Sequence, residues 1–219
     1  PNPYFPDQPS VFLDWRPQGW VNLASALAKS SNVYFYYVGG GYSVPGIDNF
    51  KGLGIDRLFK YWSSFNLDQP TQIDYPSEAT GFLPNPAYKE SQGKNWLLGD
   101  TYNVSIGQGD LLITPLELLN IYSFIANNGK VYQPHLNKDL TPKIILQKKY
   151  FNYEISEVAK GLVEASQKDY GTAHLLKDLP MVVAAKTGTS QVQNNQKTNA
   201  FFVGYAPAQD PQIEILIYI

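Results

Sequence analysis

The segment MVVAAKTGTS, residues 181–190, joins an apolar, β-rich run to the motif Lys186-Thr187-Gly188-Thr189. Two further apolar runs follow it, and polar, turn-forming residues separate the three. The runs are Met181 to Lys186, Ala200 to Tyr205 and Ile213 to Ile219, with loops at Asn194-Asn195 and from Pro207 to Pro211. This pattern predicts three strands in antiparallel succession, with the motif at the end of the first strand.

Upstream of these strands the sequence favours helices. The expected helices are Leu23 to Lys29 after an Asn22 cap, Val33 to Val38 after an Asn32 cap and before Gly39-Gly40-Gly41, Ile55 to Phe65, Thr114 to Ile125, and Ile155 to Val163. Thr114-Pro115-Leu116-Glu117 follows a capping-box pattern. The region 66–99 is a long connection of the kind that is often functional. Helices followed by a strand meander predict an α/β fold, an α+β sandwich in which helices pack on an antiparallel β-sheet.

Composition narrows the class of protein. The 219 residues are 43% hydrophobic, which is enough for a sizeable core. The net charge is −2, so the chain lacks the excess of positive charge that binds a nucleic acid. The absence of cysteine excludes disulfides and thiolate metal sites. Pro1 to Pro9 has no signal-peptide pattern, and no apolar stretch approaches the roughly 20 residues of a membrane span. We expect residues 1–219 to be a fragment of one domain, cut at both ends.

Two motifs could carry chemistry. Lys186 could fix an anion or alter the pKa of a neighbouring hydroxyl, Gly188 lets a ligand approach the backbone, and Thr187 and Thr189 offer hydroxyl and N–H donors. Ser30-Ser31-Asn32 lies between two predicted helices, where a hydroxyl and an amide could face a cleft. Taken alone, each has a simpler interpretation: a surface lysine before a glycine turn, and an Asn32 helix cap.

The two motifs are stronger evidence in combination. S-x-x-K, S-x-N and K-T-G are the three active-site motifs of penicillin-binding proteins and serine β-lactamases, and two of the three occur here in order. Further blocks extend the match along nearly the whole chain: Gly19 to Leu23, Ser30 to Tyr36, Gly99 to Asn103, Ser105 to Gly109, Thr114-Pro115, Asn128 to His135, Gly171 to Ala173 and Phe202 to Pro207. On these blocks the chain resembles the transpeptidase domain of class B penicillin-binding proteins of the rod-elongation, penicillin-binding protein 2 type.

The chain departs from the family pattern in three places. Ala185 stands where glycine is common, and Asn199 where many relatives have histidine. More seriously, no S-x-x-K motif with the nucleophilic serine precedes Ser30. Ser91-Gln92-Gly93-Lys94 has the spacing but follows S-x-N and is expected in a polar loop, so we interpret it as accidental. Glu117 to Asn120 has the spacing of a deacylating site, but the capping box explains Glu117 better.

The resemblance implies a D,D-transpeptidase that cross-links peptidoglycan stem peptides through an acyl-serine intermediate and is a target of β-lactams. Ser30 would relay a proton, Asn32 would hold the substrate amide, and Lys186 would favour ionised intermediates. Thr187 and Thr189, on either side of Gly188, would bind the terminal carboxylate, and the Thr189 N–H would help form the oxyanion hole. Without the nucleophile, this chain alone is expected to be inactive.

The same resemblance implies an extracytoplasmic, membrane-anchored location and a membrane glycosyltransferase partner. We expect no cofactor and no metal, since His135 and His174 lack partners at ligand spacing. Two alternatives remain: a non-catalytic scaffold module of a cell-wall assembly, and the β-lactam-sensing domain of a receptor. The blocks at 99–115 argue against the receptor.

Overall fold

The structure is a computed structural model that describes residues 10–42, 49–149, 152–192 and 197–219. The segment Pro1 to Pro9 and the loop expected at Asn194-Asn195 lie outside these ranges.

A three-stranded antiparallel sheet forms one layer of the molecule. Its strands are β3 (Ala184–Val192), β4 (Lys197–Ala206) and β5 (Ile213–Tyr218), in the order β3-β4-β5. The predicted meander is therefore confirmed, but the position of the motif was wrong. Because β3 pairs with β4 from Ala184 through Val192, Lys186-Thr187-Gly188-Thr189 lies inside the strand and not at its end. The motif thus lies along the free edge of the sheet.

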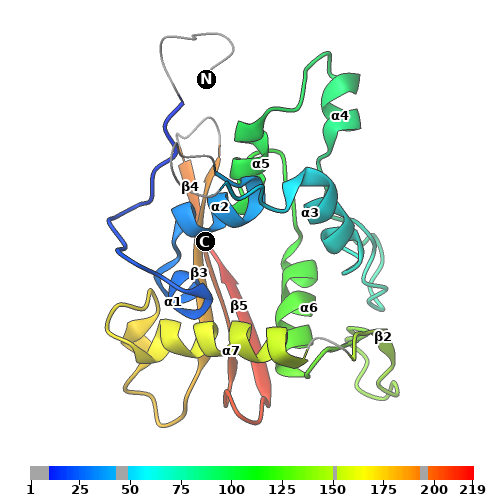
Figure 1. The fold of residues 1–219 in the computed structure, drawn as a ribbon. Coiled ribbons are helices and arrows are strands. Elements are labelled where there is room, and N and C mark those ends of the chain that lie inside the picture. The colour runs from blue at the N-terminus through cyan, green and yellow to red at the C-terminus, as the bar shows by residue number, and fades with distance from the viewer. Residues whose placement is uncertain (1–9, 43–48, 150–151, 193–196) are drawn as a thin grey trace.

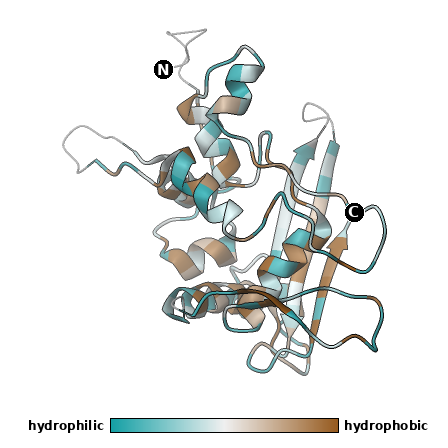
Figure 2. Ribbon diagram, turned by 90° about the vertical axis from the view of Figure 1, so that its right-hand side faces the viewer, coloured by the Kyte–Doolittle hydropathy of each residue, from teal (hydrophilic) through white to brown (hydrophobic). Residues whose placement is uncertain are grey.

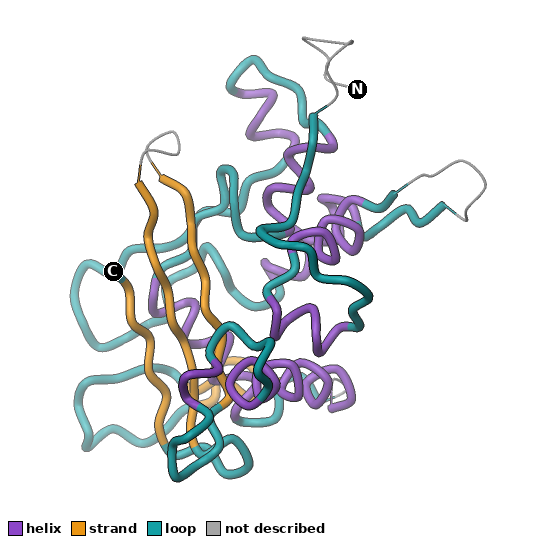
Figure 3. Tube along the Cα trace, turned by 90° about the vertical axis from the view of Figure 1, so that its left-hand side faces the viewer, coloured by secondary structure: helices purple, strands orange, loops and turns teal. Residues whose placement is uncertain are grey.

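Helices gather on one side of this sheet, as Figures 1 and 3 show. The two longest are α6 (Pro115–Ala126) and α7 (Asn152–Gln167), and both predicted segments are confirmed as helices. Their apolar side chains meet the sheet in a core formed by Tyr122, Leu162, Ala184, Val203 and Tyr205. The expected α+β sandwich is the observed architecture, and its core fixes the sheet relative to the helices.

Helix α1 (Leu23–Lys29) packs against α7. The Asn22 side chain caps it, as predicted, by accepting from the Ser25 N–H at 2.9 Å, and its three alanines are buried. A Cβ at Gly161 of α7 would lie 2.9 Å from the Leu27 Cβ, so the glycine permits this close approach. The contact sets the position of the residues that follow α1.

Helix α2 (Asn32–Gly40) continues two residues further than the sequence suggested. Gly39 and Gly40 do not end it; they let it pack on α5 (Leu98–Ser105), because a Cβ at Gly39 would meet the Ser105 hydroxyl at 1.7 Å. The helix ends only at Gly41, where φ is +78°.

The predicted helix at Ile55 to Phe65 is present as α3 (Gly54–Ser63), but several short elements were missed. They are α4 (Pro86–Ser91), α5, the 3-10 helix η1 (His174–Leu176), and the antiparallel pair β1 (Lys130–Tyr132) and β2 (Ile144–Gln147). Region 66–99 is therefore partly helical.

The outer face of β5 is apolar. Ile213, Ile215 and Ile217 are 57%, 46% and 49% exposed, and the C-terminal strand is brown in Figure 2.

Within the described residues, every helix is too short or too polar to traverse a bilayer.

Candidate active-site groove

A groove of about 1240 Å³ runs between the free edge of β3 and the ends of α1, α2 and α5. Ser30, Asn32, Lys186, Thr187, Gly188 and Thr189, the six site residues predicted from the sequence, all line it. The groove also contains side chains that were not among the predicted site residues. These are Asp14, Trp15, Asn103, Gln108, Thr172 and Gln191, among others.

Ser30 occupies the turn between α1 and α2. It adopts the left-handed conformation (φ 55°, ψ 48°), which costs a residue with a Cβ roughly 1 kcal/mol. Local contacts hold this turn in place. The Ser30 N–H donates to the carbonyl oxygens of Ala26 and Leu27, and the Trp15 indole N–H donates to the carbonyl oxygens of Lys29 and Ser30 at 3.1 and 3.2 Å. The Ser30 hydroxyl is thereby presented at the groove.

Asp14 anchors the residues that follow Ser30. Its carboxylate accepts from the Ser31 hydroxyl at 2.7 Å and from the Val33 N–H at 3.3 Å. Burial alone would raise the pKa of Asp14, but the hydrogen bonds from Ser31, Gln18 and the backbone of Asn32 and Val33 outweigh it, so the pKa is lowered. The carboxylate therefore stays ionised while it fixes the start of α2.

Asn32 was wrongly predicted to cap α2. The cap is Ser31, whose hydroxyl accepts from the Tyr34 N–H at 3.4 Å, and Asn32 is the first helical residue. This difference frees the Asn32 carboxamide, which donates to the Leu13 carbonyl oxygen at 3.4 Å and lines the groove.

Lys186 reaches across the groove from β3. Its ammonium group donates to the Ser30 hydroxyl at 2.8 Å and to the carbonyl oxygen of Thr187. Burial lowers the pKa of Lys186 to about 8, because no described carboxylate compensates the lost hydration. Near neutral pH the lysine is therefore mostly charged, close to its point of deprotonation.

The other residues of the motif follow Lys186 along the edge strand. The Thr187 hydroxyl donates to the Thr172 hydroxyl at 2.7 Å. The Thr172 N–H in turn donates to the Ala28 carbonyl oxygen at 3.0 Å, which fixes Thr172 in place. Gly188 and Thr189 are exposed to the groove. A Cβ at Gly188 would contact only the Phe201 Cβ, at 3.7 Å, so the protein's own packing does not demand glycine here.

Two groove residues were missed because their contacts depend on tertiary structure. Asp14 lies 17 positions from Ser31. Gln108 belongs to a block noted in the sequence, Ser105 to Gly109, yet nothing there showed that its side chain would reach β3, 81 positions away. Its flanking glycines, both with positive φ, were the available signal of an unusual loop.

The other serine-lysine string lies outside the groove. Ser91 is the last residue of α4 rather than part of a loop, and its hydroxyl donates to the Tyr88 carbonyl oxygen at 2.7 Å. Ser91 and Lys94 are both exposed, and neither lines the groove.

Glu117 has the structural role predicted for it. The capping box with Thr114 is present: Glu117 accepts from the Thr114 N–H at 2.7 Å, and the Thr114 hydroxyl accepts from the Glu117 N–H at 3.2 Å. The buried carboxylate also accepts from the N–H groups of Asp68 and Gly81, both at 2.9 Å. Glu117 thus ties two loops to the start of α6.

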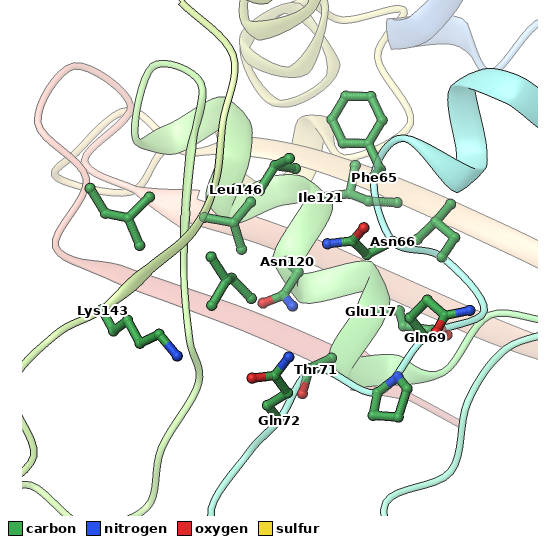
Figure 4. A pocket seen from close by; sticks show the side chains of 15 residues that line it. Phe65, Asn66, Gln69, Thr71, Gln72, Glu117, Asn120, Ile121, Lys143 and Leu146 are labelled. Atoms are coloured by element: carbon green, nitrogen blue, oxygen red, sulfur yellow. The ribbon is translucent and has the colours of Figure 1, made fainter.

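A second, smaller cavity of about 290 Å³ lies beside this end of α6 (Figure 4). Asn120 and Ile121 of α6, Thr71 and Gln72 of the preceding loop, and Lys143 line it with others. It contains none of the motif residues.

His135 and His174 both make local contacts, to the carbonyl oxygens of Asn137 at 2.7 Å and Gly171 at 2.9 Å. Among the residues that the structure describes, no three His, Cys, Asp or Glu side chains form a group that could hold a metal ion.

Comparison with known proteins agrees with this geometry. The family model for the penicillin binding protein transpeptidase domain matches residues 2–219. The chain is 30% identical to the peptidoglycan D,D-transpeptidase MrdA of Acinetobacter baumannii, over 98% of its own length and 34% of that protein. It spans about a third of the length of the curated relatives that it matches.

Solved structures share the fold. Penicillin-binding protein 2 of Helicobacter pylori superposes with a TM-score of 0.80 at 29% identity, covering 94% of this chain and 38% of that one. A chain of a peptidoglycan synthase complex, described for its coordination of polymerization and crosslinking, matches with a TM-score of 0.76 at 26% identity, over 98% and 36%. The chain therefore belongs to the transpeptidase family of penicillin-binding proteins, and the relatives it resembles are of the class B, penicillin-binding protein 2 type.

Proposed function

We propose that this chain forms the substrate-binding part of a peptidoglycan D,D-transpeptidase. The observation that carries the proposal is the contact of Lys186 with Ser30 in a groove bounded by an edge strand. The reaction would proceed through an acyl-serine: a serine oxygen attacks the carbonyl of the penultimate D-Ala, the terminal D-Ala leaves, and an amine of a second peptide takes the acyl group.

The motif on β3 suits the terminal carboxylate of such a peptide. Lys186 provides a cation, and the side chains of Thr187 and Thr189 lie on the same side of the strand, two residues apart. The Thr189 hydroxyl would donate to the carboxylate, and the Thr187 hydroxyl would do so by turning away from Thr172, to which it donates in the structure. Gly188 leaves the backbone open to close approach. Together these groups would bind a carboxylate, and the Thr189 N–H would donate to the oxyanion of the tetrahedral intermediate.

Ser30 and Asn32 would act on the other side of the scissile bond. The Ser30 hydroxyl already accepts from Lys186, so its own proton is free to pass to the leaving amine, and the Lys186 ammonium can restore it. The Asn32 carboxamide, which lines the same groove, would hold the amide of the substrate.

The nucleophile would come from outside this chain. Three serines of the described residues line the groove, but Ser31 donates to Asp14 and Ser105 donates to the Thr101 carbonyl oxygen, at 2.7 and 2.6 Å. Ser30 accepts from the ammonium group of Lys186 and is assigned the relay. The family's S-x-x-K serine would therefore have to lie elsewhere in the natural full-length protein.

By the same proposal, the full-length protein acts on the extracytoplasmic side of a bacterial membrane, binds β-lactams as substrate mimics, and works with a membrane glycosyltransferase. The similar chain found in a peptidoglycan synthase complex supports the last point. Residues 1–219 would form a fragment of one transpeptidase domain, and that domain would need no cofactor.

A fluorescent penicillin tests the proposal. The natural full-length protein that contains this chain should become covalently labelled, and the peptide map should place the label on a serine outside residues 1–219. Lys186→Ala should reduce labelling at least a hundredfold, because it removes both the cation and the partner of Ser30. The matched control Lys94→Ala should label normally.

Other outcomes would decide against the proposal. A full-length protein that folds but takes no label would favour the scaffold module. Label on Ser30, Ser91 or another serine of this chain would show that the nucleophile has been wrongly placed.

A further inference from the structure

The free edge of β3 carries backbone groups that the sheet leaves unused. β3 is an outer strand, so alternate residues turn their N–H and C=O groups away from β4. The Thr187 and Thr189 carbonyl oxygens and the Gln191 N–H point this way, since each contacts a side chain in the groove. By the same alternation the Thr189 N–H points into the groove as well.

Gln108 occupies this edge. Its carboxamide nitrogen donates to the Thr189 carbonyl oxygen at 3.2 Å, and its carboxamide oxygen accepts from the Gln191 N–H at 3.4 Å. One side chain thus takes the two backbone positions that a neighbouring strand would use. The loop that carries it, Gly107 to Gly109, has positive φ at both glycines and belongs to the opposite wall of the groove.

An extended peptide that lies along β3 needs one of these positions. Antiparallel addition to an edge strand uses the N–H and the C=O of the same residue. If the Thr189 N–H faces the oxyanion, the adjacent Thr189 carbonyl oxygen is the natural acceptor for a backbone N–H next to the scissile carbonyl. In the structure, Gln108 donates to that acceptor.

We propose that Gln108 is a specificity-determining residue, a side-chain latch on β3 that a substrate must displace from Thr189 to form its own backbone hydrogen bond. The inference rests on the proposed function of the groove. Ligands with an amide N–H beside the reactive carbonyl compete with the latch, whereas ligands without one never contact the latched acceptor. Gln108 therefore sets the relative reactivity of these two classes of ligand.

Two β-lactams form a matched pair of probes. Benzylpenicillin has an acylamino N–H beside the lactam carbonyl, and penicillanic acid is the same bicyclic lactam without that group. The rate constant of acylation is measured for both with the natural full-length protein, its Gln108→Met variant and its Gln108→Glu variant. Methionine removes both contacts at similar size, whereas glutamate can still accept from the Gln191 N–H but cannot donate to Thr189.

The readout is the ratio of the two rate constants. Both variants should raise the ratio of benzylpenicillin to penicillanic acid about two- to tenfold, which corresponds to one net hydrogen bond. A general effect of packing, or of the glutamate charge, would alter both rates and leave the ratio unchanged. Urea unfolding confirms that each variant is folded.

An unchanged or lowered ratio in both folded variants would overturn the latch. Failure of the unsubstituted protein to react with either lactam would instead overturn the proposed function, and the latch with it. The two failures are therefore distinguishable.

Discussion

The ammonium group of Lys186 and the hydroxyl of Ser30 lie 2.8 Å apart, although 156 positions separate them in the chain. The contact joins the sheet to the turn between α1 and α2, and both residues line the groove. It also places a cation whose pKa is lowered to about 8 beside a hydroxyl that could carry a proton. Both the pH dependence of the site and its chemistry are expected to follow from this pair.

The first prediction concerns the pH dependence of acylation. Lys186 is charged below about pH 8 and neutral above it, so the rate of acylation by benzylpenicillin in the full-length protein should fall as pH rises through 8. Lys186→Arg should react more slowly but lose this fall, since arginine stays protonated. The control Lys94→Arg, an exposed site, should keep it. A fall near pH 8 that persists in Lys186→Arg would assign the titration to another group.

Local signals in the sequence predicted several elements correctly. Asn22 before α1 and Thr114-Pro115 before α6 specify caps through residues three positions away, so a linear pattern suffices. Helix α5 was missed because it contains Gly99 and is stabilised by packing on the glycines of α2. The extent of β3 was also wrongly predicted. Pairing with β4 determines how far this strand extends, and Gly188 within the motif suggested that the strand ends there.

Some residues of the candidate site could likewise be predicted from the sequence, and others could not. Ser30, Asn32 and Lys186 were found because their motifs resemble those of a known family. Asp14 belongs to no such motif, and Gln108 lies in the matching block Ser105 to Gly109 but was not identified there as a site residue. The importance of each depends on a three-dimensional contact, with Ser31 for Asp14 and with Thr189 for Gln108. The capping of α2 was assigned to the wrong residue because Ser31 and Asn32 are both good caps, and only the contact with Asp14 distinguishes them.

The second prediction concerns the anchor of the Ser30 turn. Asp14→Ala should lower the free energy of unfolding by about 1 to 2 kcal/mol, because the Ser31 hydroxyl and the Val33 N–H lose a charged acceptor that is partly exposed. Ser31→Ala should cost about 1 kcal/mol through the lost cap. Urea unfolding of both variants and of the double variant should give a coupling of at least about 0.5 kcal/mol.

Strict additivity of the two substitutions would contradict the anchor. Asp139→Ala serves as the control, since Asp139 is exposed and should change stability by less than about 0.5 kcal/mol.

The third prediction separates a structural from a catalytic Glu117. Glu117→Gln should destabilise the protein by about 2 kcal/mol or more, because the three backbone N–H groups of Asp68, Gly81 and Thr114 cannot all be satisfied by one amide oxygen. The rate at which a penicilloyl group leaves the full-length protein should not change. Thermal unfolding and the decay of the fluorescent label measure the two effects. A slower decay at unchanged stability would reverse the assignment.

The last prediction concerns Glu214, which lies opposite Tyr205 on β4 and has a buried carboxylate oxygen with no hydrogen-bond partner among the described residues. Burial raises the pKa of Glu214 to about 8 from 4.5. The nearby hydroxyls of Tyr122 and Tyr205 stay neutral, since burial also raises the pKa of both. Between pH 4.5 and 8 the folded state therefore binds more protons than the unfolded state. The stability that Glu214 contributes is complete below pH 4.5 and is lost as pH rises through 8.

Urea unfolding at pH 5 and at pH 8 measures this loss. From pH 5 to pH 8, Glu214→Gln should lose less stability than the unsubstituted chain, whereas the exposed control Glu154→Gln should lose as much as the unsubstituted chain. An equal loss in Glu214→Gln would mean that this carboxyl is ionised in the folded protein and finds its partner in solvent.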